Sequence, residues 1–184
     1  DFPNLSSVAT DDIAAAKCAV DALFDAGHTK IGILGGDIEN RTPAISVLSA
    51  VSRAFWNMIL VCAGKSYEKA RFSYDSAYRG MNADRQVSGY HGCVCHVGCH
   101  GDRCDPCIAG FRIPCAEDVS VIGFDGTALA EYYNPKLATI KQQYQTLATR
   151  SVEILFGQIE LKRSQIHEIV PFELASGESI QKIR

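Results

Sequence analysis

The densest group of reactive side chains lies in His91–Cys107, where five cysteines and three histidines fall within seventeen residues. Thiolate and imidazole groups are ligands that zinc prefers, and Cys104-x-x-Cys107 has the spacing of one ligand pair. A second pair of similar spacing is missing, because Cys93-x-Cys95 is too close. A redox pair is also disfavoured, since Asp105-Pro106 lies in a cysteine-crowded loop and does not open a helix. We therefore expect no metal and no cofactor.

A second candidate for chemistry is Asp125, which directly follows the apolar run Val119–Phe124. Such a run is typical of a buried strand, and in open α/β sheets ligands bind outside the carboxyl ends of the strands. A carboxylate at that end can accept two hydroxyl hydrogen bonds from a sugar. The alternative is that Asp125 satisfies the backbone of its own turn. The residue therefore predicts either a ligand contact or a local turn contact.

Predicted helices and strands alternate along the chain and must position these side chains. Thr10 can cap a helix with Asp11 and Asp12 in its first turn, and Gly27 ends it. The run Lys30–Leu34 then predicts a buried strand, side by side with the later apolar run in one parallel sheet, which is α/β organisation. The other predicted elements are a helix over Ser73–Met81, a long amphipathic helix from Gln143 whose apolar side includes Leu147, Leu155 and Ile159, and a strand over Ile166–Leu174.

The composition is that of a folded protein of one domain, or one domain and a piece of a second. The 184 residues are 47% hydrophobic and 21% charged. The net charge is −3 and lysine and arginine are not clustered, so this chain alone should not bind DNA. No apolar run is long enough to span a bilayer, and the first residues show no signal-peptide pattern. A cytoplasmic location is expected.

Three blocks of sequence together resemble the effector-binding core of the LacI/GalR family of bacterial transcription regulators. They are SSVATDDIAAAKCAVDALFDAGHTKIGILGG (Ser6–Gly36), GFRIP with EDVSVIGFDG ending at Gly126, and NPKLATIKQQYQTLATRSVEIL (Asn134–Leu155). The resemblance implies the periplasmic-binding-protein type I fold, a three-layer α/β/α arrangement with a mostly parallel sheet. Residues 1–184 would be a core fragment, mainly the C-terminal subdomain, with residues of about 135–160 crossing toward the N-terminal subdomain. The DNA-binding headpiece and the first half of the core have no counterpart.

The resemblance implies four effector contacts. Asp125 lies where the family places an effector-contacting aspartate in its Gly-Phe-Asp turn. Gln142 and Tyr144 match positions that reach the effector at the cleft between the subdomains, an amide for hydroxyls and a ring for a sugar face. Phe72 matches a ring that stacks on the ligand. Tyr144 and Phe72 could equally be packing residues, one on the helix stripe and the other at a helix start.

The chain also departs from the family pattern. The family's effector-binding arginine precedes a Gly-aromatic pair, and the corresponding region Val47–Val51 contains no arginine, which predicts weakened effector binding. Tyr132 and Tyr133 lie where the family forms part of its dimer contact, or they are simple surface aromatics. His28 and His167 have no evident partner and are predicted to be ordinary surface residues.

The resemblance offers another explanation of the Cys/His stretch. At this place the family has a buried strand, a Ser-Asp or Asn-Asp turn and an alanine-rich helix, and a run of glycine, cysteine and histidine is unsuited to all three. Cysteine-histidine codon pairs read one nucleotide later encode alanine or valine followed by methionine or threonine. The hypothesis is that Gly89–Ala109 is a frame-shifted translation, and that as written the segment packs irregularly. Resequencing the gene across this stretch tests it.

The sequence therefore predicts the ligand-sensing core of a LacI-type regulator. A small sugar-like effector would bind between the subdomains and change the spacing of two DNA-binding headpieces in a homodimer. The alternative is a periplasmic sugar-binding protein of the same fold that serves a transporter. An enzyme is disfavoured, because the sequence offers no nucleophile with a base, no spaced carboxylate pair and no cofactor loop.

Overall fold

The computed structural model describes residues 5–29, 31–34, 59–61, 92–95, 119–132, 134–161 and 164–183. It divides the chain into two compact units. The small unit consists of Asp1–Asp11 and Gln142–Glu173, and the large unit of Asp12–Lys141 and Leu174–Arg184. The predicted helix over Ser73–Met81 lies outside the described residues.

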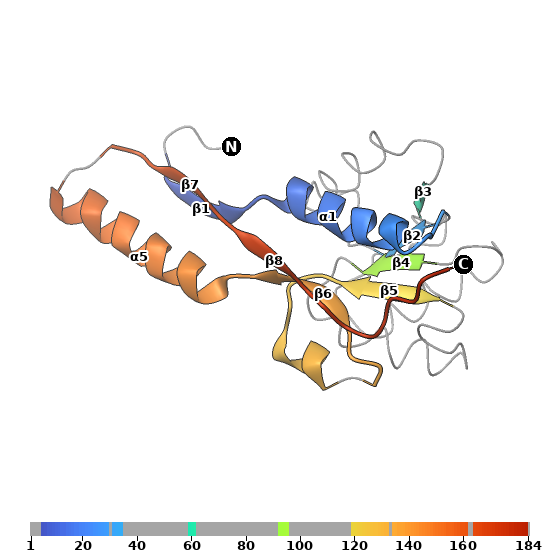
Figure 1. Cartoon of the computed structure of the whole chain (residues 1–184). Helices are drawn as coiled ribbons and strands as arrows, with labels where there is room; N and C mark the ends of the chain where they lie inside the picture. Colours follow the sequence, from blue (N-terminus) through green and yellow to red (C-terminus); the bar gives the residue numbers. More distant parts are fainter. Residues whose placement is uncertain are drawn as a thin grey trace, which may run out of the picture. The chain divides into compact units, whose positions relative to one another are not determined.

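A six-stranded sheet forms the centre of the large unit (Figure 1). Its order is β3-β2-β4-β5-β6-β8, and the neighbours from β3 to β6 are paired in parallel. This confirms the predicted α/β fold with a mostly parallel sheet. The strands are β2 (Ile31–Leu34), β3 (Ile59–Val61), β4 (Gly92–Cys95), β5 (Ser120–Gly123), β6 (Ala138–Gln142) and β8 (Phe172–Ala175).

The strand β4 corrects two predictions. β2 and β5 share one parallel sheet as expected, but they are not neighbours, because β4 pairs with both of them. β4 also comes from the Cys/His stretch, which was predicted to be unsuited to a strand. Cys93 pairs with Gly32 on one side and with Val121 on the other. Backbone hydrogen bonds to two neighbours favour the extended conformation, and cysteine behaves as a small apolar residue, so Gly92–Cys95 adopts it.

The helix α1 (Asp12–Asp25) packs against β4 and β5 through a face of small residues. Its buried positions are Ala15, Ala16, Ala19, Val20 and Leu23. Because four of these five side chains have three carbons or fewer, the helix axis can approach the sheet closely. The helix begins one residue later than a Thr10 cap would require, and Gly27 ends it as predicted, with φ of 93°.

The last residues of the large unit form a tail, residues 176–183, that hydrogen-bonds to three separate segments. The N–H of Val121 donates to the carbonyl of Ser179 (2.8 Å), and the N–H of Ile183 donates to the carbonyl of Ala26 (2.8 Å). The fully buried hydroxyl of Ser179 donates to the carbonyl of Val121 (2.6 Å) and accepts from the N–H of Ala138 (2.9 Å). The tail thereby connects β5, β6 and the end of α1.

Ser179→Ala should lower the free energy of unfolding by about 1–3 kcal/mol, because it leaves a buried N–H and weakens the bonding of a buried carbonyl. Urea denaturation of the variant and of the wild type measures the difference. Ser164→Ala is the matched control, since Ser164 is exposed. Equal midpoints for all three proteins would contradict this role of the hydroxyl.

The small unit consists of one helix and a two-stranded parallel sheet. Strand β1 (Ser7–Thr10) pairs with β7 (His167–Val170), and α5 (Tyr144–Leu161) contacts β1. The long amphipathic helix is confirmed, but its predicted apolar side is not the packed side. Leu155 and Ile159 are 55% and 67% exposed, whereas Ile154 and Gly157 are buried. β1 was not predicted, because its four residues carry no apolar alternation.

The predicted single strand over Ile166–Leu174 is two strands. β7 ends at Val170 and β8 begins at Phe172, and the two belong to different sheets. Pro171 stands between them, and a proline cannot donate a ladder hydrogen bond. A short 3-10 helix, Ala128–Glu131, lies between β5 and β6.

Candidate functional site

The turn after β5 holds its backbone in an unusual conformation. Asp125 has φ of 82° and Gly126 has φ of 61°. Left-handed backbone at a residue with a side chain costs of order 1–2 kcal/mol, although aspartate tolerates it better than most. The N–H of Gly126 donates to the hydroxyl of Thr139 on β6 at 3.3 Å, which ties the turn to the neighbouring strand. The half-buried Asp125 is therefore fixed at the carboxyl end of a parallel strand, as predicted from the sequence.

Close approach of the two backbones explains the glycine in this turn. A Cβ atom at Gly126 would lie 2.6 Å from Cα of Lys141 on β6. Only glycine satisfies both this approach and the positive φ without strain. The Asp-Gly pair is thus required by the backbone of the turn, independently of any ligand.

The predicted contacts Gln142 and Tyr144 belong to the small unit, where the chain passes from β6 into α5. The hydroxyl of Thr10 donates to Oε1 of Gln142 at 3.1 Å. This bond fixes the amide orientation of a half-buried side chain, and the sequence alone does not reveal it. Tyr144 is 51% exposed at the first position of α5, which disfavours its alternative interpretation as a core residue.

The predicted contacts are divided between units. Asp125 lies in the large unit, and Gln142 and Tyr144 lie in the small unit. Phe72 and Tyr133 lie outside the described residues, and Tyr132 is 85% exposed. The roles of these residues in binding an effector or a second subunit stay predictions.

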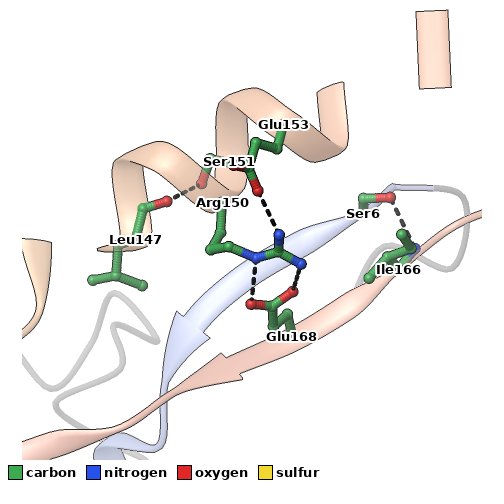
Figure 2. Close-up of polar contacts among 7 residues, drawn as sticks. All are labelled: Ser6, Leu147, Arg150, Ser151, Glu153, Ile166 and Glu168. Carbon is green, nitrogen blue, oxygen red and sulfur yellow. Dashed lines mark hydrogen bonds and ion pairs between the residues drawn. The ribbon is translucent and has the colours of Figure 1, made fainter. Parts of the chain in front are cut away.

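A cluster around Arg150 joins α5 to β7 (Figure 2). The Arg150 guanidinium donates from Nε and Nη2 to the two carboxylate oxygens of Glu168, each at 2.7 Å, and from Nη1 to Glu153. These hydrogen bonds raise the pKa of Arg150, and the bond from Arg150 lowers the pKa of Glu168. A backbone bond reinforces the same corner, since the N–H of Ile166 donates to the hydroxyl of Ser6 at 3.0 Å. The cluster stabilises the small unit.

The lowered pKa of Glu168 predicts a pH-dependent contribution to stability. The stabilisation is present above the ordinary glutamate pKa of about 4.3 and is lost as the pH falls through the lower folded-state value. Thermal melts of wild type and Glu168→Gln from pH 7 to pH 3 measure it. We expect the wild type to melt higher near neutral pH and the two curves to converge in acid. The exposed Glu173→Gln serves as control, and a gap that widens in acid would contradict the pairing.

The two histidines predicted to be ordinary surface residues behave differently. His28 is only 2% exposed, and its Nε2 lies 2.9 Å from the carbonyl oxygen of Gln181. That prediction was wrong, because the partner comes from the tail, 153 positions away in the sequence. His167 is exposed, and its Nδ1 lies 2.9 Å from the hydroxyl of Ser7.

Among the described residues, no cluster of three or more His, Cys, Asp and Glu side chains is arranged to hold a metal ion. Most of the Cys/His stretch lies outside those residues. None of the described helices has the length and apolar character that crossing a membrane requires.

Comparisons with known proteins decide the family. Residues 105–180 match the family described as periplasmic binding protein-like domain. The HTH-type transcriptional repressor PurR of Vibrio vulnificus is 31% identical over 169 residues, which are 88% of this chain and 48% of that protein. PurR of Escherichia coli is 29% identical over 153 residues, 80% of this chain and 43% of that protein. The chain belongs to the LacI/GalR family. It spans about half the length of these LacI/GalR relatives.

Solved structures share the fold at lower sequence identity. A LacI family transcriptional regulator from Enterococcus faecalis with bound ribose superposes with a TM-score of 0.83 at 17% identity, covering 100% of this chain and 67% of that one. A dimeric Lac repressor gives a TM-score of 0.84 at 18% identity, covering 100% and 67%. The curated relatives are named as LacI/GalR-type repressors, which favours a regulator over the periplasmic solute-binding alternative.

Proposed function

We propose that this chain is the ligand-sensing core of a LacI-type bacterial transcription regulator. A small sugar-like effector binds in the cleft between the two subdomains of the complete core. Binding favours one closure geometry and so modulates DNA binding, which requires a headpiece outside this chain. The mechanism needs no catalytic step, and the effector shifts the equilibrium only by its difference in affinity for the two geometries.

The match to PurR repressors over 88% of the chain is the observation that carries this proposal. Structures of the same fold have titles that name ribose or cellobiose as ligand, which supports a sugar-like effector. The organisation as a homodimer and the cytoplasmic location follow from the resemblance to such regulators. Tyr132 is proposed as part of the dimer contact, and its 85% exposure leaves it accessible to a second subunit.

Asp125 is the proposed anchor for effector hydroxyls. The turn is held by the close approach of Gly126 to Lys141, so the carboxylate is positioned before a ligand arrives. Preorganisation of this kind reduces the entropy cost of binding. Gln142, with its amide oriented by Thr10, and Tyr144 are the proposed contacts from the small unit.

A thermal-shift screen with ribose, glucose, cellobiose and purine bases tests the proposal. A probe at about 100 times its Kd should stabilise the protein by about 2.7 kcal/mol. That corresponds to a rise in Tm of about 5–10 °C for a chain of this size. Asp125→Ala should abolish the shift, whereas Asp25→Ala, at an exposed aspartate on α1, should retain it. The absence of any hit, or a hit that survives Asp125→Ala, would overturn the proposed role.

The frame-shift hypothesis for Gly89–Ala109 stays part of the proposal for the rest of this segment. Formation of β4 does not require the neighbouring cysteines, since backbone pairing alone defines that strand. Resequencing the gene decides the matter, because an unambiguous in-frame reading of these cysteines would refute the hypothesis.

A further inference from the structure

The helix α5 carries a second apolar face that is exposed. Val152, Leu155, Phe156 and Ile159 are spaced i, i+3, i+4 and i+7, so they form one stripe along the helix. Their side chains are 51%, 55%, 55% and 67% exposed. Residues at these four positions are called the α5 stripe. An apolar stripe of this length on a helix usually faces another layer of the same fold or a partner.

The opposite face of α5 is already used. Ile154 and Gly157 are buried, and the Arg150 guanidinium reaches Glu168 on β7 from this side (Figure 2). The helix therefore packs on the β1–β7 sheet with one face and presents the α5 stripe away from it. A second contact surface remains after the helix has joined its own unit.

The sheet of the small unit is incomplete in the same sense. It contains only β1 and β7, and two-stranded sheets are at best marginally stable without further packing. Successive residues of a strand point to opposite faces, so Ile169 points away from the face that Glu168 presents to α5. Ile169 is 63% exposed. Apolar surface is thus exposed on both sides of the small unit.

The lengths of the fold neighbours indicate what covers this surface. Each of two LacI-type structures covers the whole of this chain, and yet this chain accounts for only 67% of theirs. We propose that the α5 stripe is the docking surface for the part of a LacI-type core that has no counterpart in this chain. That part adds strands beside β1–β7 and helices over both faces, whether it arrives on the same polypeptide or on another.

A second copy of this chain is the competing occupant, and the geometry disfavours it. Pairing of two α5 stripes would cover the outer side of the helix only. It would leave Ile169 exposed and add no strand to the two-stranded sheet. The rest of a LacI-type core covers all of these surfaces together.

Co-expression tests the proposal without any effector. The full chain is produced with a tagged polypeptide carrying the part of the Vibrio vulnificus PurR core that lies outside the match to this chain. We expect the two to purify as a 1:1 complex. Phe156→Lys should weaken its formation about tenfold or more, as expected for a central apolar contact. Thr146→Lys is the matched control, since it adds the same charge at an exposed position of α5 outside the stripe, and it should leave the complex intact.

The outcomes separate the occupants. Circular dichroism of the free variants checks that the folds are unchanged. A homodimer of the chain that Phe156→Lys dissociates, with no complex with the PurR part, would show that a second copy is the occupant and would overturn the proposal. Absence of any association, or equal effects of Phe156→Lys and Thr146→Lys, would overturn it as well.

Discussion

Replacing Gly177 with alanine should destabilise the large unit by about 3 kcal/mol, the upper end for added atoms in a packed region. A Cβ atom at this position would lie 2.2 Å from the backbone nitrogen of Ala138 and 2.5 Å from the carbonyl carbon of Leu137. Both atoms are backbone, so no side chain can rotate away. The tail cannot withdraw either, because Ser179 and Glu178 immediately after Gly177 are hydrogen-bonded to Lys136.

Urea denaturation followed by circular dichroism measures this effect. Ser176→Ala is the control, since it changes the exposed residue next to Gly177. A loss of less than about 0.5 kcal/mol, the range of ordinary surface substitutions, would show that the tail can shift to admit a methyl group.

Gly126→Ala should cost about 2–3 kcal/mol, since two penalties act together. The positive φ of 61° disfavours any side chain, and the new Cβ would lie 2.6 Å from Cα and 2.7 Å from Cβ of Lys141. The turn must move, which displaces Asp125. We therefore expect the variant to lose both stability and any effector-induced thermal shift.

The double variant Gly126→Ala with Lys141→Ala distinguishes backbone from side-chain crowding. Trimming Lys141 removes the contact to its Cγ at 2.8 Å but leaves its Cα in place, so most of the destabilisation should persist. Lys141→Ala alone should change little, because this side chain is exposed. Full rescue in the double variant would mean that the backbone approach is not the cause.

Local patterns predicted the elements that carry their own signal. Helix α1, with acidic residues at its start and Gly27 after its end, and the apolar strands β2 and β5 were all identified. Elements whose stability comes from distant partners were missed. β1 and β6 have short, weakly apolar sequences, and each is a strand because a neighbour pairs with it. The apolar side of α5 was identified, but its pattern could not reveal which face would pack.

The candidate site divides in the same way. Asp125 was predictable because a carboxylate after an apolar run lies at a strand end whatever the rest of the fold does. The Thr10–Gln142 bond joins residues 132 positions apart, and the His28–Gln181 bond joins residues 153 apart. No local pattern encodes such pairs. The close approach of Gly126 to Lys141 left only the Asp-Gly dipeptide as a signal.

The tail has a consequence for biosynthesis. A ribosome makes the chain from its amino end, and the partners of the tail, Ala26, Val121 and Ala138, are all synthesised well before Ser179 and Ile183. Until Ile183 has left the exit tunnel, β5 and the end of α1 lack these bonds. The large unit must therefore wait in a partly formed state while the whole of α5 and β7 is being translated.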